Sequence, residues 1–96
     1  MPAARTTNHP LSLRLYVAGA APNSLLAIAN VRAICAKHFA SAHKLEVVDM
    51  LVAPQRALAD GIIVTPTLLR LSPLPMRRLI GTLSDTAQVL LALESP

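Results

Sequence analysis

An alternating apolar segment, followed by a helical pattern and a second apolar run, constrains the fold most. From residue 11 to residue 18, leucine or valine occupies every second position, and this period of two predicts a strand. Residues 22–40 predict a helix whose core stripe, mostly at spacings of three and four, is Ile28, Val31, Ile34, Cys35 and Phe39. Residues 45–51 are apolar again and predict a second strand. A strand–helix–strand unit of this length requires parallel strands joined by a right-handed crossover.

The second half of the chain contains shorter elements separated by glycine and proline. We expect a short helix within residues 52–61, then strands at residues 68–71 and 76–80 around a proline-flanked turn. A last helix is expected from residue 85 to residue 94. Side-chain caps are predicted at Asn23 or Ser24 for the first helix and at Ser84 for the last. The class is therefore α/β with the order β-α-β-α-β-β-α, which resembles the thioredoxin arrangement.

The composition limits the cell compartment and the kinds of partner that we expect. Residues 1–10 are polar and hold two prolines, so we expect a flexible N-terminal arm before a single domain at residues 11–94. One cysteine excludes an internal disulfide, and neither a signal peptide nor a membrane span is evident, which predicts a cytoplasmic location. The net charge of +4 comes from scattered residues, and aromatic residues make up 2% of the chain. Both features argue against binding to nucleic acid.

No catalytic, cofactor-binding or metal-binding residues are predicted. A thioredoxin-type enzyme needs a low-pKa cysteine where its first helix begins, but residues 20–23 carry no thiol. Cys35 falls in the middle of that helix on the apolar stripe, which favours a small buried side chain. His38 and His43 are five residues apart, a spacing that does not match helical zinc ligands. We therefore expect a binding module rather than an enzyme.

The adjacent arginines Arg77 and Arg78 stand beside the proline-flanked turn. One interpretation makes them a contact for a partner. The other makes one of them a charged guard on an exposed sheet edge, because edge strands often carry such charges. The sequence leaves both open.

Several motifs in chain order resemble the KaiB family of circadian clock proteins. They cover about residues 11–93, and each is weak alone but specific in combination. A related sensor domain of a clock histidine kinase is less similar, because it lacks the long match from Pro73 to Ser84. The matching motifs are Leu15-Tyr16-Val17-Ala18-Gly19 with Pro22-Asn23-Ser24, Val48-Asp49 with Pro54-Gln55, Thr65-Pro66-Thr67-Leu68, Pro73 through Gly81, Leu83-Ser84-Asp85 and Val89-Leu90.

The resemblance implies a protein that is not an enzyme and that docks on a KaiC-type ATPase, with clock output kinases as further partners. It also implies two arrangements: the thioredoxin-like one, and an oligomeric ground state, usually a tetramer, whose rearranged second half has the order β-α-β-β-α-α-β. Candidate residues for partner binding or for the switch are Pro66, Pro73, Pro75, Arg77, Arg78, Gly81 and Ser84.

Departures from the family pattern identify a divergent member. Positions on the outer face of the first helix that are usually charged are here Leu26, Ala29, Ala33 and Ala36. We predict that these four residues form a contact stripe, used for self-association into a dimer or tetramer or for a partner. The loss of charge also supports a second function, in which the chain is an oligomeric adaptor without affinity for KaiC.

Overall fold

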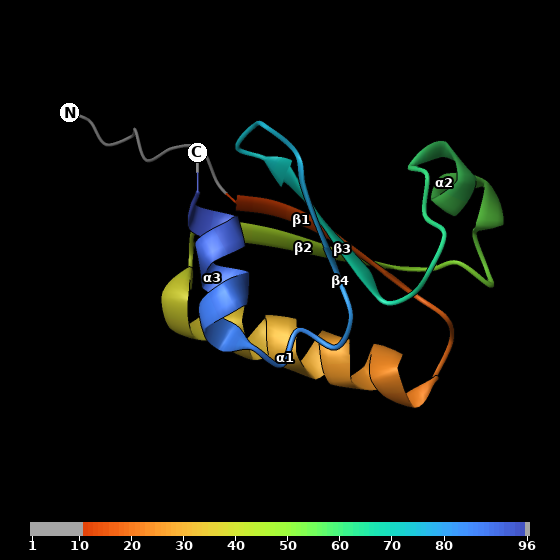
Figure 1. Ribbon diagram of the computed structural model, residues 1–96, viewed down its shortest axis with the longest axis horizontal. Helices are drawn as coiled ribbons and strands as arrows, with labels where there is room; N and C mark the ends of the chain where they lie inside the picture. The colour runs from red at the N-terminus through yellow and green to blue at the C-terminus, as the bar shows by residue number, and fades with distance from the viewer. Residues whose placement is uncertain (1–10, 96) are drawn as a thin grey trace.

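The computed structural model describes residues 11–95, so the arm expected at residues 1–10 lies outside the described part of the chain. Within that part, the predicted order of elements is confirmed (Figure 1). The elements are β1 (Leu11–Val17), α1 (Pro22–His38), β2 (His43–Asp49), α2 (Pro54–Ala59), β3 (Thr67–Ser72), β4 (Arg77–Ile80) and α3 (Thr86–Glu94).

The four strands form one mixed sheet in the order β2-β1-β3-β4. β1 and β2 are parallel, with Leu11 opposite His43 and Val17 opposite Asp49, as the strand–helix–strand pattern predicted. β3 runs antiparallel to β1, and β4 runs antiparallel to β3. β2 and β4 are therefore the two edges of the sheet. The other predicted order, β-α-β-β-α-α-β, is not the arrangement of this structure.

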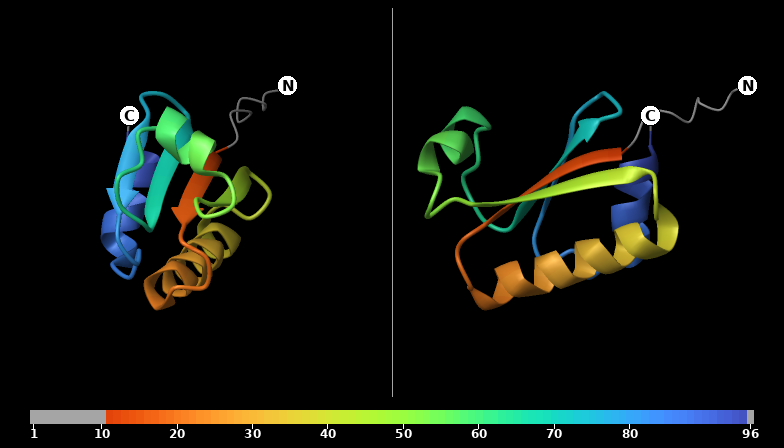
Figure 2. Two further views of the ribbon diagram at one scale, coloured as in Figure 1. Left: turned by 90° about the vertical axis from the view of Figure 1, so that its right-hand side faces the viewer. Right: turned by 180° about the vertical axis from the view of Figure 1, so that it is seen from behind.

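α1 and α3 cover one face of the sheet and α2 packs at one end of the other, and β1 supplies side chains to both cores (Figure 2). Leu11, Leu13, Leu15 and Val17 pack with α1 and α3 in the larger core, whereas Tyr16 packs beneath α2 in the smaller one. This is the alternation that the sequence predicted. Figure 1 shows α1 running along one face, and α2 standing beyond the far end of the other.

The core stripe of α1 is rotated slightly from its predicted position. Val31, Ile34 and Cys35 are buried as expected, but Ile28 and Phe39 are only partly buried. The face is completed instead by Ala27 and Ser24, which are small enough for the helix to approach the sheet closely.

The predicted helix caps are wrong. α1 begins at Pro22 after Ala21 with no side-chain cap, since a proline in the first turn has no N–H to satisfy. Ser24 Oγ accepts the N–H of Ala18 instead, at 3.1 Å. At α3 the cap is Asp85, which accepts the N–H of Gln88 at 3.2 Å. Ser84 is one residue too early for that role.

The second strand lies two residues earlier than predicted because Asp49 ends it. Asp49 Oδ1 accepts the N–H of Leu51 at 2.9 Å and the N–H of Gly19 at 3.0 Å. The carboxylate therefore ties the end of β2 to the turn that follows β1. The apolar residues at 50 and 51 extend the sequence pattern but not the strand.

Candidate partner-binding surfaces

The predicted switch residues gather on the β3–β4 hairpin and the segments beside it. Pro73 and Pro75 are exposed in the turn, whereas Pro66 is buried before β3. The peptide bonds that precede these three prolines are cis. The N–H of Gly81 donates to the carbonyl oxygen of Pro66 at 3.0 Å, which closes the base of the hairpin. Gly81 has a φ of 115°, a backbone conformation that disfavours any side chain.

Arg77 and Arg78 lie on the edge strand β4 and are both exposed. Arg78 nevertheless has a structural contact: its guanidinium donates to the carbonyl oxygens of Gly61 at 3.0 Å and Asp60 at 3.1 Å. These carbonyls follow the last turn of α2, where a cation is favourable. Arg78 thus joins the edge of the sheet to the end of α2, a role that the sequence did not predict.

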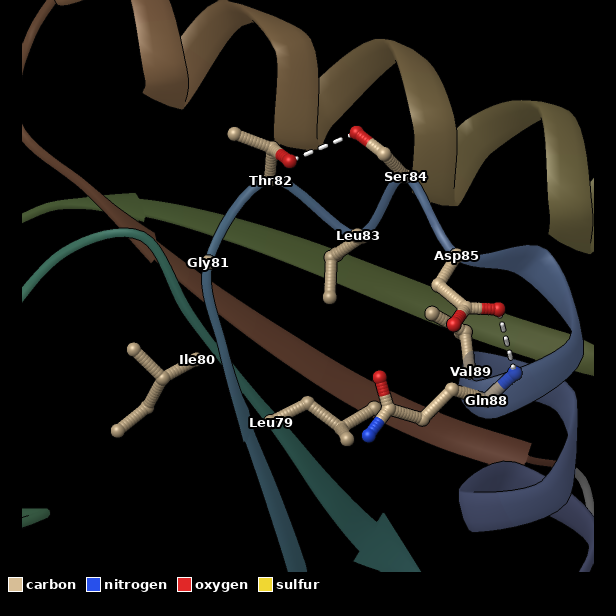
Figure 3. A pocket seen from close by; sticks show the side chains of 9 residues that line it. All are labelled: Leu79, Ile80, Gly81, Thr82, Leu83, Ser84, Asp85, Gln88 and Val89. Carbon is tan, nitrogen blue, oxygen red and sulfur yellow. Dashed lines mark hydrogen bonds between the residues drawn. The ribbon is translucent and has the colours of Figure 1, made fainter.

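Ser84 lines a pocket of about 360 Å³ between β4 and the start of α3 (Figure 3). Its Oγ is 2.7 Å from Thr82 Oγ1, and Asn30 of α1 donates to the carbonyl oxygen of Thr82 at 2.8 Å. Leu83 between them is buried and has a φ of 61°, which is strained for a leucine. The segment that leads into α3 is therefore tightly positioned against α1.

The predicted stripe on α1 is separate from this hairpin. Leu26 is 51% exposed, and Ala29, Ala33 and Ala36 are exposed too. The four residues lie on the side of the helix away from the sheet, as predicted. Leu25 beside them is 52% exposed and widens the apolar area.

Sequence reasoning missed a more apolar surface around α2, which we call the α2 patch. Its members precede α2, lie within it or follow it, and none packs into either core. They are Leu51, Val52, Leu58, Ile63 and Val64, with exposed fractions of 71%, 80%, 81%, 89% and 45%. Exposed apolar areas on soluble proteins are typical of interaction sites, so these five residues are a candidate for one. The signal available in the sequence was the apolar run at residues 62–64, between the predicted short helix and the strand that follows it.

Sequence reasoning also missed a charged network that positions α2 on the sheet. Glu46 on β2 pairs with Arg14 at 2.9 Å and with Arg56 of α2 at 2.7 Å. Arg14 also reaches Asp60 at 2.9 Å. The buried hydroxyl of Tyr16 donates to Asp60 Oδ2 at 2.6 Å and also lies 2.9 Å from the carbonyl oxygen of Arg56. Residues from β1, β2 and α2 thus meet beside the α2 patch and hold that helix in place.

The network lowers the pKa of both of its carboxyl groups. Hydrogen bonds from Arg56 and then Arg14 lower the pKa of Glu46 to about 2. The hydroxyl of Tyr16, followed by Arg14, lowers the pKa of Asp60. Burial raises the pKa of Tyr16, and its hydrogen bond to Asp60 adds to that effect. All four charged groups are therefore ionised at neutral pH.

We predict that Glu46 makes stability depend on pH in the acid range. Its pKa is lower in the folded chain than in the unfolded one, so its contribution is complete above about pH 4.5 and is lost as the pH falls towards about 2. Because the side chain is 45% exposed, screening keeps this contribution below about 1 kcal/mol. Urea unfolding at pH 7 and pH 3 should give a smaller difference in Glu46→Gln than in the wild type.

A suitable control is Glu94→Gln at the end of α3, outside the network. It should preserve the wild-type difference between the two pH values. Equal differences in the wild type and Glu46→Gln would show that this carboxylate does not link folding to pH.

Arg70 is the least expected of the charged residues. It lies on β3, is only 1% exposed, and is the largest fully buried side chain in the described residues. Burial, and secondarily the charge of Arg77, lower the pKa of its guanidinium. The sequence showed Arg70 as one scattered basic residue, because nothing in a strand pattern tells which arginine is buried.

Other chemistry has little support in the described residues. Cys35 is buried, and burial raises the pKa of its thiol, which disfavours the reactive thiolate. Between residues 11 and 95, no three His, Cys, Asp or Glu side chains gather closely enough to hold a metal ion. No helix of that region is long and apolar enough to cross a bilayer.

Comparison with known sequences identifies close relatives. The family model described as the KaiB domain matches residues 14–95. A circadian clock oscillator protein KaiB from Prochlorococcus marinus MIT 9313 is 48% identical over 82 residues, which cover 85% of this chain and 69% of that protein. The protein of the same name from Synechococcus elongatus PCC 7942 is 46% identical over 82 residues, which cover 85% of this chain and 80% of that protein.

Comparison with solved structures confirms the predicted thioredoxin-like class. The N-terminal domain of SasA from Synechococcus elongatus aligns with a TM-score of 0.74 and 28% identity, over 92% of this chain and 87% of that one. A thioredoxin from Halobacterium salinarum aligns with a TM-score of 0.71 and 16% identity, over 91% of this chain and 75% of that one. The second likeness concerns the fold alone.

Proposed function

The chain belongs to the KaiB family, and on that premise we propose that it is a non-enzymatic regulator that docks on a KaiC-type ATPase in a timing system. Its relatives are circadian clock oscillator proteins, and the SasA domain has the same fold. These likenesses support a role in a clock. The choice of a KaiC-type ATPase as the partner rests on the resemblance.

The α2 patch is the observation that carries the proposal. Leu58 and Ile63 are 81% and 89% exposed, which is costly for a domain that works alone. The charged network and Arg78 link α2 to the sheet in this arrangement, so less ordering is needed when a partner covers it. We assign docking of the ATPase to this patch.

The α1 stripe supports self-association rather than docking of the ATPase. Leu26 and its three alanine neighbours form a smooth apolar face on which a helix of a second copy fits closely. The stripe lies on α1, on the opposite face of the sheet from α2 (Figure 2). The two surfaces can therefore be changed independently.

The β3–β4 hairpin supplies the proposed switch residues. Pro66, Gly81 and Ser84 lie where the hairpin meets α1 and α3, while Pro73, Pro75 and Arg77 lie exposed on the hairpin. A rearrangement of the second half would break the bond between Gly81 and Pro66. It would also break the contact of Arg78 with the end of α2.

We predict that the protein comigrates with a KaiC-type ATPase. Labelled protein should move from its own peak into the ATPase peak in size-exclusion chromatography, because the α2 patch is covered on binding. The same experiment with bovine serum albumin in place of the ATPase should leave the peak unmoved. If the label stays in its own peak at tens of micromolar, the proposal fails and the oligomeric adaptor is the better description.

A further inference from the structure

We propose that Arg70 is a latch that holds the C-terminal end of α3 on the β3–β4 hairpin, and that opening this latch frees α3 while the rest of the domain stays folded. The latch lies within the chain and works whichever partner the α2 patch binds.

The contacts of Arg70 join two segments that are far apart in the sequence. Nη1 donates to the carbonyl oxygens of Ala92 at 3.1 Å, Leu93 at 3.2 Å and Ser95 at 2.6 Å. Nη2 donates to the carbonyl oxygen of Pro75 in the hairpin turn at 2.7 Å. The hairpin turn and the end of α3 lie at the same end of the molecule (Figure 1).

The end of a helix is where such a donor has the greatest effect. The last four carbonyls of an α-helix have no partner within the helix, and the helix dipole makes this end negative. Arg70 provides both hydrogen bonds and positive charge there. A glycine just after the helix or a lysine in its last turn commonly satisfies these carbonyls, but α3 is followed by Ser95 and has no basic residue in its last turn.

Arg70 makes several hydrogen bonds, but burying its charge costs free energy. The guanidinium is buried, and the hydrogen bonds above all go to neutral main-chain carbonyls rather than to a carboxylate. Nε is buried and has no hydrogen-bond partner in the described residues. Arg77 stands opposite Arg70 in the β3–β4 ladder and carries the same charge. Opening the latch returns a desolvated cation to water, which offsets part of the lost hydrogen bonding.

Few other contacts hold α3. Only Val89 and Leu93 of this helix are buried, with Leu90 partly buried beside them. The segment leading into it contains Leu83 in a strained conformation with a φ of 61°. An element with few buried anchors opens separately from the core more easily than a central strand does.

The test compares hydrogen exchange in Arg70→Met and Arg32→Met by mass spectrometry. Methionine keeps an unbranched apolar side chain at position 70 but cannot donate to the helix end. In Arg70→Met, amides of residues 89–94 should exchange at least about tenfold faster, while those of β1 change less than twofold. Arg32→Met removes the same charge from an exposed position on α1, and should match the wild type in both segments.

The conservative variant Arg70→Lys keeps the charge with fewer and less directed donors. We expect faster exchange in residues 89–94 than in the wild type, but slower than in Arg70→Met. Unchanged exchange of these residues in Arg70→Met would overturn the latch. So would a parallel increase in β1, which would make Arg70 a general stability residue. If Arg70→Met does not fold, Arg70→Lys decides by the same comparison of residues 89–94 with β1.

Discussion

Replacing Leu58 and Ile63 together by glutamate is expected to reduce affinity for a KaiC-type ATPase at least a hundredfold. Both side chains belong to the α2 patch and are 81% and 89% exposed, so the folded monomer should accept the change. Buried in an interface, two unpaired carboxylates would have to be desolvated, which costs several kcal/mol, and about 2.7 kcal/mol is a hundredfold in affinity. The measurement is a titration by fluorescence anisotropy, with circular dichroism to check the fold.

The matched control for this variant is Ala87→Glu with Leu91→Glu. Both residues are exposed and lie on α3, away from the α2 patch and from the stripe on α1. The control adds the same charge and should bind the ATPase with wild-type affinity. An equal loss in both variants would mean that net charge, not the α2 patch, governs binding. Full affinity in the first variant would place the docking surface elsewhere.

Dilution is expected to shift the protein from an oligomer to the thioredoxin-like monomer, with the second half changing structure. The segment from residue 84 to residue 94 suits two structures: Ser84 and Asp85 favour the start of a helix, whereas residues 89–91 would also suit a strand. Packings that differ by a few kcal/mol can be exchanged by burial in an oligomer. Amide NMR spectra after dilution should show two sets of peaks for residues 65–94 and nearly one set for residues 11–42.

The balance between the two sets should depend on the α1 stripe. Leu26→Glu places a charge on that stripe, so the monomer should predominate in it at concentrations where the wild type is still oligomeric. A single set of peaks at every concentration, with residues 84–94 helical throughout, would contradict the second arrangement. If Leu26→Glu is as oligomeric as the wild type at each concentration, the stripe does not take part in self-association.

Much of the candidate site could be placed from the sequence, but its contacts could not. Local signals gave the proline-flanked turn and the paired arginines beside it, whereas the candidate role of these residues and of Gly81 came from the resemblance to the KaiB family. The exposure of Leu26 also followed from helical spacing. The α2 patch was missed because an apolar residue looks the same in the sequence whether it is buried or exposed. Ala57 and Leu58 are neighbours in one helix, yet 2% and 81% exposed.

The helix caps show that even a local feature can be mispredicted from the sequence by one residue. Ser84 and Asp85 both have side chains that cap helices, and the sequence alone favoured the first. The structure selects Asp85, because Ser84 is held by Thr82 and Asn30 in the segment that crosses α1. A contact with a residue 54 positions earlier therefore decided a feature that seemed local.

The sequence by itself determined the order of elements, the two-sided alternation of β1 and the burial of Cys35. These depend on the period of side chains along one strand or helix, which neighbouring residues define. Only the tertiary structure decided that Arg70 is buried at the end of α3, that Arg78 joins β4 to α2, and that Glu46 and Asp60 share Arg14. The physical reason is that a charged side chain takes its role from whichever carbonyl or carboxylate the folded chain brings within hydrogen-bonding distance. Those partners lie between 17 and 46 residues away along the chain.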